Sequence, residues 1–231
     1  MQETAPTKAY NLWASGYDQQ PANLMLSLDE IVFAQLLEDM EINGKTIVDI
    51  GCGTGRHWRQ LFDRKPSSLT GYDVSEKMLQ VLKQKFPAAT THLLHGDKLD
   101  ATPEETVDII ISTLTIAHIE KPATALGEWN RVLKPGGHIV ITDYHPGALE
   151  KGGKRTFVHK GKTISVKNHV HSIEKITGIA EQLHWQKLRL VEKTVDESAR
   201  PWYEQQDALA VYESFKGTPV IYGILFTKRG T

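Results

Sequence analysis

Three glycines at alternate positions, Gly51, Gly53 and Gly55, stand between a short apolar run and a predicted helix. Residues 45–50 have the composition of a buried strand, and residues 56–64 have that of a helix. Glycine lets the backbone turn tightly between them, because no Cβ obstructs the bend. Backbone N–H groups at the start of the helix then face a gap, which suits an anionic or polar group of a ligand.

The spacing within this loop distinguishes two kinds of ligand. A dinucleotide-binding loop has the pattern G-x-G-x-x-G, in which the third glycine permits close approach of the pyrophosphate. Here Arg56 stands at that third position, Gly55 comes one residue earlier, and Asp49 precedes the first glycine. The resulting D-x-G-x-G-x-G pattern resembles the first motif of the class I methyltransferases that use S-adenosylmethionine (SAM).

Acidic residues follow the next two predicted strands. Asp73 ends the strand predicted at residues 69–73, and it lies roughly 20 residues after the glycine loop, the offset at which a carboxylate accepts hydrogen bonds from a ribose. In the family that the loop resembles, an acid at this place binds both ribose hydroxyls. Asp97 follows the strand predicted at residues 90–95. The resemblance implies that Asp97 accepts a hydrogen bond from the adenine amino group, with the Lys98 N–H opposite a ring nitrogen.

Two further segments extend the resemblance. Residues 133–138, L-K-P-G-G-H, predict a tight turn into the apolar strand 139–144, and this turn recurs in the family with a structural role. Residues 13–18, W-A-S-G-Y-D, resemble a segment common ahead of the glycine loop in small-molecule methyltransferases (type 11 or 25). The resemblance therefore covers residues 10–145, and its motifs together are more specific than any one of them.

The resemblance also implies a set of cofactor contacts to SAM and to its product, S-adenosylhomocysteine. Residues 113–119 close the cofactor pocket in the family and face the methyl acceptor. His118 is predicted to contact the cofactor or to help remove a proton from the acceptor, since neutral imidazole is a good base near pH 7; a purely structural role is the alternative. The predicted cofactor residues are Tyr17, Asp49, Gly51, Gly53, Gly55, Asp73, Val74, Met78, Asp97, Lys98, Leu114 and His118.

Histidine, arginine and aromatic residues outside the glycine loop and the two acids are candidates for the acceptor site. His145 directly follows a predicted strand, so we expect it to face the pocket as a second candidate base. No carboxylate or cysteine stands at ligand spacing from the nearby histidines, so we expect no metal site. Surface charge or helix packing is the alternative for the arginine and the late aromatic residues. The predicted acceptor residues are Tyr10, Trp13, His145, Arg155, His171, Trp202 and Tyr203.

The alternation of predicted strands and helices indicates an α/β fold with a mainly parallel sheet. We expect a Rossmann-like three-layer sandwich in which the sheet has seven strands and the last strand is antiparallel. One domain is expected over residues 1–231, with lid helices in residues 1–40 and acceptor-side insertions at residues 145–171 and 196–219. A hairpin is predicted at 155–167 and a helical segment at 202–215. The spacing of the aromatic residues near the N-terminus supports the lid, because such rings can cover an adenosine and a sulfonium cation.

The composition limits the class of protein. Of 231 residues, 40% are hydrophobic and 24% charged, as in ordinary soluble globular proteins. A net charge of −1 argues against a nucleic-acid surface or a polybasic membrane patch, and the single cysteine excludes an internal disulfide. No apolar run approaches the ~20 residues that span a bilayer, and no signal peptide is recognisable. We therefore expect a cytoplasmic monomer or homodimer.

The sequence favours an enzyme that moves the methyl group of SAM to an oxygen or nitrogen atom of a small molecule. Three alternatives stay open. An oxidoreductase with a dinucleotide cofactor is opposed by Arg56 in the loop. A non-catalytic nucleotide-binding module and a SAM-using enzyme with other chemistry are compatible with the same motifs.

Overall fold

The computed structural model describes residues 3–20 and 23–230. Its main sheet has seven strands in the order β4-β3-β2-β5-β6-β10-β9. Within this sheet β10 (Pro219–Lys228) is antiparallel to both of its neighbours, β6 (Leu133–Tyr144) and β9 (Trp185–Thr194), and the other neighbouring pairs are parallel. The predicted fold class is confirmed, including the antiparallel last strand.

The parallel half of the sheet contains β2 (Thr46–Ile50), β3 (Ser68–Asp73), β4 (Thr90–Leu93) and β5 (Val107–Thr113). Three consecutive isoleucines in the middle of β5, residues 109–111, are fully buried. A strand covered on both faces needs apolar side chains in both directions, which explains this continuous run.

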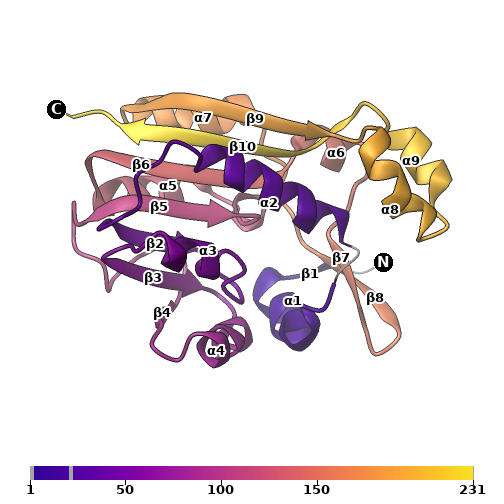
Figure 1. Cartoon of the computed structure of the whole chain (residues 1–231), viewed down its shortest axis with the longest axis horizontal. Coiled ribbons are helices and arrows are strands. Elements are labelled where there is room, and N and C mark those ends of the chain that lie inside the picture. Colours follow the sequence, from indigo (N-terminus) through magenta and orange to yellow (C-terminus); the bar gives the residue numbers. More distant parts are fainter. Residues whose placement is uncertain (1–2, 21–22, 231) are drawn as a thin grey trace.

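Helices cover both faces of the sheet (Figure 1). On one face lie α2 (Leu24–Leu36), α3 (Trp58–Asp63) and α4 (Glu76–Lys85). On the other lie α5 (Pro122–Val132) and α7 (Ile173–Gln182). Each face has its own apolar core, so the molecule is a three-layer sandwich.

α2 packs on the sheet and does not form part of a lid. A Cβ added to Gly223 of β10 would lie 2.4 Å from a methyl group of Val32 and 2.7 Å from one of Leu36, both in α2. The Asn23 side chain caps the helix by accepting hydrogen bonds from two backbone N–H groups of its first turn. The lid expected across residues 1–40 is therefore limited to the segment before α2.

A second, three-stranded sheet lies beyond the carboxyl ends of the parallel strands (Figure 1). In it, β1 (Glu3–Thr4) pairs with β8 (Lys162–Val166), and β8 pairs with β7 (Thr156–His159). The hairpin predicted at 155–167 is confirmed, whereas its pairing with the start of the chain was not predicted. We call this sheet together with α1 (Pro6–Trp13) the lid.

The lid has a small apolar core of its own. The ring of Trp13 stacks on Phe157 with centroids 4.4 Å apart, and Ala9 and Val166 are buried beside them. Stacked aromatic pairs contribute about 0.5–1.5 kcal/mol beyond their buried area. The N-terminal helix and the hairpin after β6 therefore pack as one unit.

Two predicted segments differ in detail. The tight turn predicted at 133–138 is the irregular start of β6, where Gly136 has a φ of +76° and the register with β5 shifts. The helical segment predicted at 202–215 is interrupted, because the first helix ends at Glu204 and Asp207 in the turn that follows has a φ of +51°. The elements there are η3 (Glu197–Ala199), α8 (Arg200–Glu204) and α9 (Leu209–Phe215).

The remaining short elements are η1 (Ala14–Gly16), η2 (Ile116–His118) and α6 (Pro146–Glu150). η2 follows β5 and α6 follows β6, so both lie at the same edge of the sheet as the lid. In the described ranges, no helix has both the length and the apolar character required to cross a bilayer.

Candidate functional site

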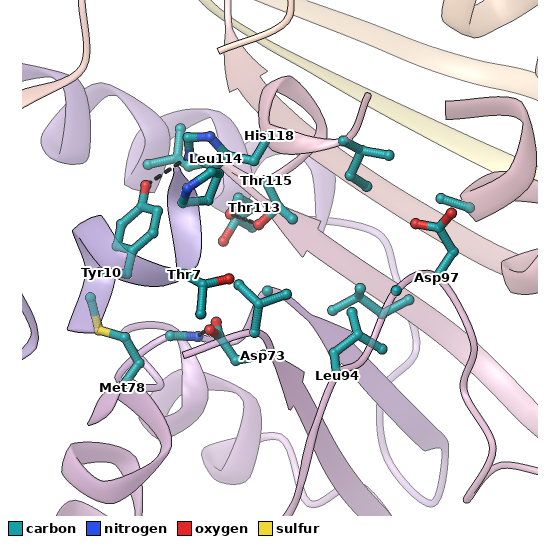
Figure 2. Close-up of a pocket in the computed structure, with 18 of the residues that line it drawn as sticks. Thr7, Tyr10, Asp73, Met78, Leu94, Asp97, Thr113, Leu114, Thr115 and His118 are labelled. Carbon is teal, nitrogen blue, oxygen red and sulfur yellow. Dashed lines mark hydrogen bonds between the residues drawn. The ribbon is translucent and has the colours of Figure 1, made fainter. Parts of the chain in front are cut away.

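A cavity of about 300 Å³ lies between the lid and the carboxyl ends of the parallel strands (Figure 2). Its walls come from α1, Tyr17 just after η1, the glycine loop, the residues at and after the ends of β3, β4 and β5, α4 and α5. The lining residues are Pro6, Thr7, Tyr10, Tyr17, Ile50, Gly51, Gly53, Asp73, Val74, Met78, Leu94, Gly96, Asp97, Leu99, Thr113, Leu114, Thr115, His118, Ile119, Glu120, Ala125 and Trp129.

The glycine loop forms one wall of the cavity with bare backbone. Gly51 has a φ of +75°, and a Cβ there would lie 2.0 Å from Thr115 Oγ1. A side chain is therefore excluded by conformation and by space. Gly55 also has a positive φ, but its neighbours are Leu82 and Trp58, and it does not line the cavity. Gly55 serves the packing of α3 and α4 in this structure.

Asp73 stands at the end of β3 beside this loop. The backbone N–H of Gly53 donates to Asp73 Oδ2 at 2.8 Å, and that of Ser75 donates to Oδ1 at 2.8 Å. Burial raises the pKa of Asp73 to about 6, although these bonds favour the ionised form. Ser75 also caps α4 by accepting from the Met78 N–H. The carboxylate is thereby fixed at the cavity wall.

The cavity is elongated, with Asp97 at one end. Figure 2 shows Asp97 far from Tyr10 and His118, which lie at the opposite end, with Asp73 between the two ends. Asp73 and Asp97 therefore line the same cavity, although they follow different strands. This is the arrangement that the sequence predicts for the two acids.

A smaller cavity continues from the main one behind the glycine loop. It shares Tyr17, Gly51, Gly53 and Thr113 with the main cavity and adds Asp49 and Arg56 among its lining residues. Trp58 Nε1 donates to Asp49 Oδ2 at 2.7 Å, and burial raises the pKa of Asp49 to about 7. A carboxylate and a guanidinium on the walls of one recess suit a ligand group that carries both charges.

Arg56 is held in place by a buried acid that the sequence analysis did not identify. Asp29 of α2 is fully buried and accepts hydrogen bonds from the Arg56 guanidinium and the Thr142 hydroxyl, and it lies 3.2 Å from His57 Nε2. Burial opposes ionisation, but the bonds from His57 and Arg56 lower the pKa of Asp29 to about 2. The helix before the loop is thus linked electrostatically to the loop.

His145 lies away from the cavity, contrary to the expectation. Its Nδ1 accepts from the Gly147 N–H at 3.0 Å, and its Nε2 lies 2.9 Å from Glu192 Oε1 on β9. The chain turns into α6 directly after β6, and this turn directs the ring towards β9. Both ring nitrogens are engaged in structural contacts.

Other predicted acceptor residues also lie outside the cavity lining. Trp13 belongs to the lid core, and Arg155 is buried beside Asp143, with their charged atoms 2.8 Å apart. His171 Nε2 lies 2.7 Å from the Ile119 carbonyl oxygen. Trp202 and Tyr203 belong to α8. The predicted acceptor set therefore contributes Tyr10 alone to the lining of this cavity.

The predicted cofactor set agrees better with the cavity. Nine of its twelve members line the cavity, and the three that do not are Asp49, Gly55 and Lys98. Asp49 lines the smaller cavity, and the Lys98 side chain is exposed. The set omitted Thr7, and it omitted Thr113 and Thr115 although the segment 113–119 was expected at the pocket. The alternation of Thr113 and Thr115 around Leu114 was a usable signal, because residues at the end of a central parallel strand face the ligand crevice.

Comparison with known proteins is consistent with this geometry. Residues 48–141 match the family model described as "Methyltransferase domain". A solved SAM-dependent methyltransferase from Mesorhizobium loti has the same fold, with a TM-score of 0.67 and 21% identity, over 84% of this chain and 96% of that one. The fold and the matched domain together define a Rossmann-like methyltransferase.

Two relatives are similar to this chain in sequence. An uncharacterised methyltransferase of Emericella nidulans is 29% identical over 213 residues, which cover 76% of this chain and 73% of the relative. A demethylmenaquinone methyltransferase of Tropheryma whipplei (strain Twist) is 31% identical over 146 residues, which cover 60% of this chain and 59% of the relative. The domain match, these relatives and the fold support a class I SAM-dependent methyltransferase, with SAM as the cofactor.

Proposed function

We propose that this protein transfers the methyl group of SAM to an oxygen or nitrogen atom of a small-molecule acceptor. One observation carries the proposal: the glycine loop, Asp73 and Asp97 line a single elongated cavity in the order that an adenosine requires. Asp97 would accept from the adenine amino group, and Asp73 would accept from the ribose hydroxyls.

The smaller cavity supports the same placement of the cofactor. The amino-acid end of SAM carries an ammonium and a carboxylate. Asp49 would attract the ammonium, and Arg56 would attract the carboxylate. A nicotinamide dinucleotide has no such zwitterionic end, and its pyrophosphate would meet the carboxylate of Asp49. The recess therefore favours SAM over a dinucleotide.

The acceptor would approach from the end of the cavity opposite Asp97. Tyr10, Tyr17, Leu114 and His118 line that end, so it is largely aromatic and apolar. The sulfonium carries the electrophilic carbon, and the protein orients the nucleophile for in-line attack. The name of the Tropheryma whipplei relative suggests one small molecule to test, a demethylmenaquinone. We propose that the protein acts as a monomer or homodimer.

Calorimetric titration with SAM, S-adenosylhomocysteine and NAD⁺ tests the cofactor. The proposal expects both adenosyl ligands to bind and NAD⁺ not to bind. Methyl transfer is then measured as S-adenosylhomocysteine formed with a panel of phenols, hydroquinones, carboxylates and amines. Binding of NAD⁺ without SAM would contradict the cofactor. SAM binding with no turnover across the panel would favour a non-catalytic or differently reacting protein.

A further inference from the structure

Arg155 contacts α1, the segment after β5 and the end of β6 at the acceptor end of the cavity. Its Nη2 donates to Asp143 Oδ1 at 2.8 Å, and its Nη1 donates to the Leu114 carbonyl at 2.6 Å. Nη1 also lies 3.2 Å from the Tyr10 hydroxyl and in close contact with His118 Nε2. The Arg155 side chain is 3% exposed. We call these residues the Arg155 cluster.

Each partner of Arg155 is a residue that shapes the acceptor end. Tyr10, Leu114 and His118 all line the cavity, and Figure 2 shows them grouped there. Leu114 has a φ of +54°, a conformation that costs a non-glycine residue about 1–3 kcal/mol and persists only when the surroundings hold it. The bond from Arg155 to its carbonyl is one such restraint.

Asp143 holds the same region from the sheet. Its Oδ2 accepts from the Ala117 N–H at 2.8 Å, one residue before His118, while its Oδ1 accepts from Arg155. Asp143 is fully buried. A buried carboxylate requires a paired charge, so Arg155 and Asp143 form one unit that fixes η2 against the lid.

The contacts of His118 determine which ring nitrogen carries the proton. Nδ1 lies 3.1 Å from the Lys167 carbonyl oxygen, which can only accept, so Nδ1 is the protonated atom. Nε2 therefore has the lone pair, and that lone pair faces two donors. One is the Tyr10 hydroxyl at 2.9 Å, and the other is the Arg155 guanidinium. The basic atom of His118 is occupied before any acceptor binds.

The surroundings of His118 also disfavour its protonation. Burial, and then the positive charge of Arg155, lower the pKa of His118 well below its usual value. His169 adds to this effect, Tyr10 faces the ring from α1, and Asp143 reaches it through Arg155. His118 stays neutral at physiological pH, but it has no free lone pair with which to deprotonate an acceptor.

We propose that Arg155, paired with Asp143, is a positioning residue that holds His118 by its Nε2 lone pair as the hydrogen-bonding partner of Tyr10, and that the Tyr10 hydroxyl is the group that meets the acceptor. With Arg155 also donating to Nε2, the Tyr10 proton can turn to an acceptor oxygen or nitrogen in the cavity. This inference rests on the proposed methyl transfer, but its central claim concerns His118 alone.

These contacts limit the protonation state in which the acceptor can bind. In the transfer step the nucleophile's lone pair forms the bond to the methyl carbon, and the carbon–sulfur pair goes to sulfur. No proton passes to His118. The acceptor is therefore an amine that binds in its neutral form, or an oxygen acid already ionised when it binds. Tyr10 orients that nucleophile by donating to a second polar atom of the acceptor.

Histidine-labelled protein tests the claim by NMR, with the His118→Gln variant identifying the His118 signals. The proposal expects the Nδ1–H form in wild type and no protonation between pH 8 and pH 6. In the Arg155→Met/Asp143→Asn variant, which removes both charges and leaves neither unpaired, His118 should titrate at higher pH, while the Lys167 carbonyl keeps Nδ1 protonated. A wild-type His118 in the Nε2–H form, or one unaffected by the double substitution, would overturn the proposal. Arg155→Lys provides a second variant that keeps the charge.

Calorimetry and kinetics separate this claim from the proposed function. The double variant should bind SAM as wild type does, and its kcat should fall by roughly 10- to 100-fold, the loss typical of a misplaced reacting group. Tyr10→Phe should lower kcat by a similar factor and leave the His118 tautomer unchanged. Failure of SAM to bind wild type would contradict the proposed function while leaving the NMR result intact. An unchanged kcat in both variants would overturn the roles given to Arg155 and Tyr10.

Discussion

The backbone N–H of Gly53 donates a 2.8 Å hydrogen bond to Asp73 Oδ2, which ties the glycine loop after β2 to the acid at the end of β3. The two parts of the cofactor site are therefore oriented by each other before a ligand arrives. The pairing of β2 with β3 sets this distance, since Ile50 and Tyr72 are register partners just before the two residues.

Replacing Asp73 with alanine should weaken SAM binding by about 1–3 kcal/mol, the range for losing hydrogen bonds to a charged group. Calorimetric titration measures the change. Asp100→Ala is a matched control, because Asp100 is an exposed acid on the loop after β4 and does not line the cavity. Equal affinity in wild type and the Asp73 variant would remove Asp73 from the site.

The affinity for SAM should depend on pH through the same residue. The ionised carboxylate accepts from two ribose hydroxyls, and the protonated one accepts less well. Because the pKa of Asp73 is raised to about 6, affinity should be full above that value and fall below it, by up to about tenfold per pH unit. Asp73→Asn should lose this slope. A wild-type affinity that is constant from pH 7.5 to pH 5 would contradict the assignment.

Gly51→Ala should both destabilise the fold and abolish SAM binding. The new Cβ would overlap Thr115 Oγ1, and alanine at a φ of +75° carries strain of about 1–3 kcal/mol. Adding Thr115→Ala removes the closest atoms but leaves the strain, so the double variant should recover only part of the stability. Urea unfolding of the two single variants and the double variant measures this, and full recovery would contradict the backbone argument.

Asp29→Asn should lower the free energy of unfolding by about 3–5 kcal/mol, because it leaves the largely buried Arg56 with only the exposed Glu30 as a charge partner. The folded-state pKa of Asp29 is about 2, below its unfolded value. The stabilisation is therefore present above the unfolded pKa and is lost as pH falls towards 2. Urea unfolding between pH 7 and pH 3 checks both points, with the exposed neighbour Glu30→Gln as control. Equal losses in the two variants would contradict this role.

His145→Ala should leave SAM affinity within experimental error and cost less than about 1 kcal/mol of stability, since its partner Glu192 is a largely exposed charge. Calorimetry and urea unfolding measure the two quantities. A severalfold loss of SAM affinity would show that the ring reaches the cofactor site in solution.

Most of the predicted cofactor residues lie together along one cavity, whereas most of the predicted acceptor residues do not. Gly51, Asp73 and Asp97 follow consecutive parallel strands, and strand order alone brings such residues to one edge of the sheet. His145 also follows a strand of that edge. Its direction depends on the cap of α6 and on Glu192 of β9, a contact between distant parts of the chain that no local pattern encodes.

In the fold too, features set by local sequence were predicted, and contacts between distant segments were not. The helices and strands of the sandwich follow from apolar periodicity, and most were predicted. The pairing of β1 with β8 was not predicted, because β1 contains only Glu3 and Thr4 and is ordered by its partner. Arg155 was predicted as a possible acceptor contact because of its charge. Its burial depends on the ion pair with Asp143, and no role was predicted for Asp143, which lies in an apolar strand.

The lid combines the first residues of the chain with a hairpin that ends at Val166. A ribosome synthesises these parts about 10–30 s apart, at rates of roughly 5–20 residues per second. The nascent chain must therefore expose the open end of its cofactor cavity until the hairpin emerges. Adenosyl ligands should protect the finished protein from proteolysis, and they should protect chains that stop before residue 155 much less.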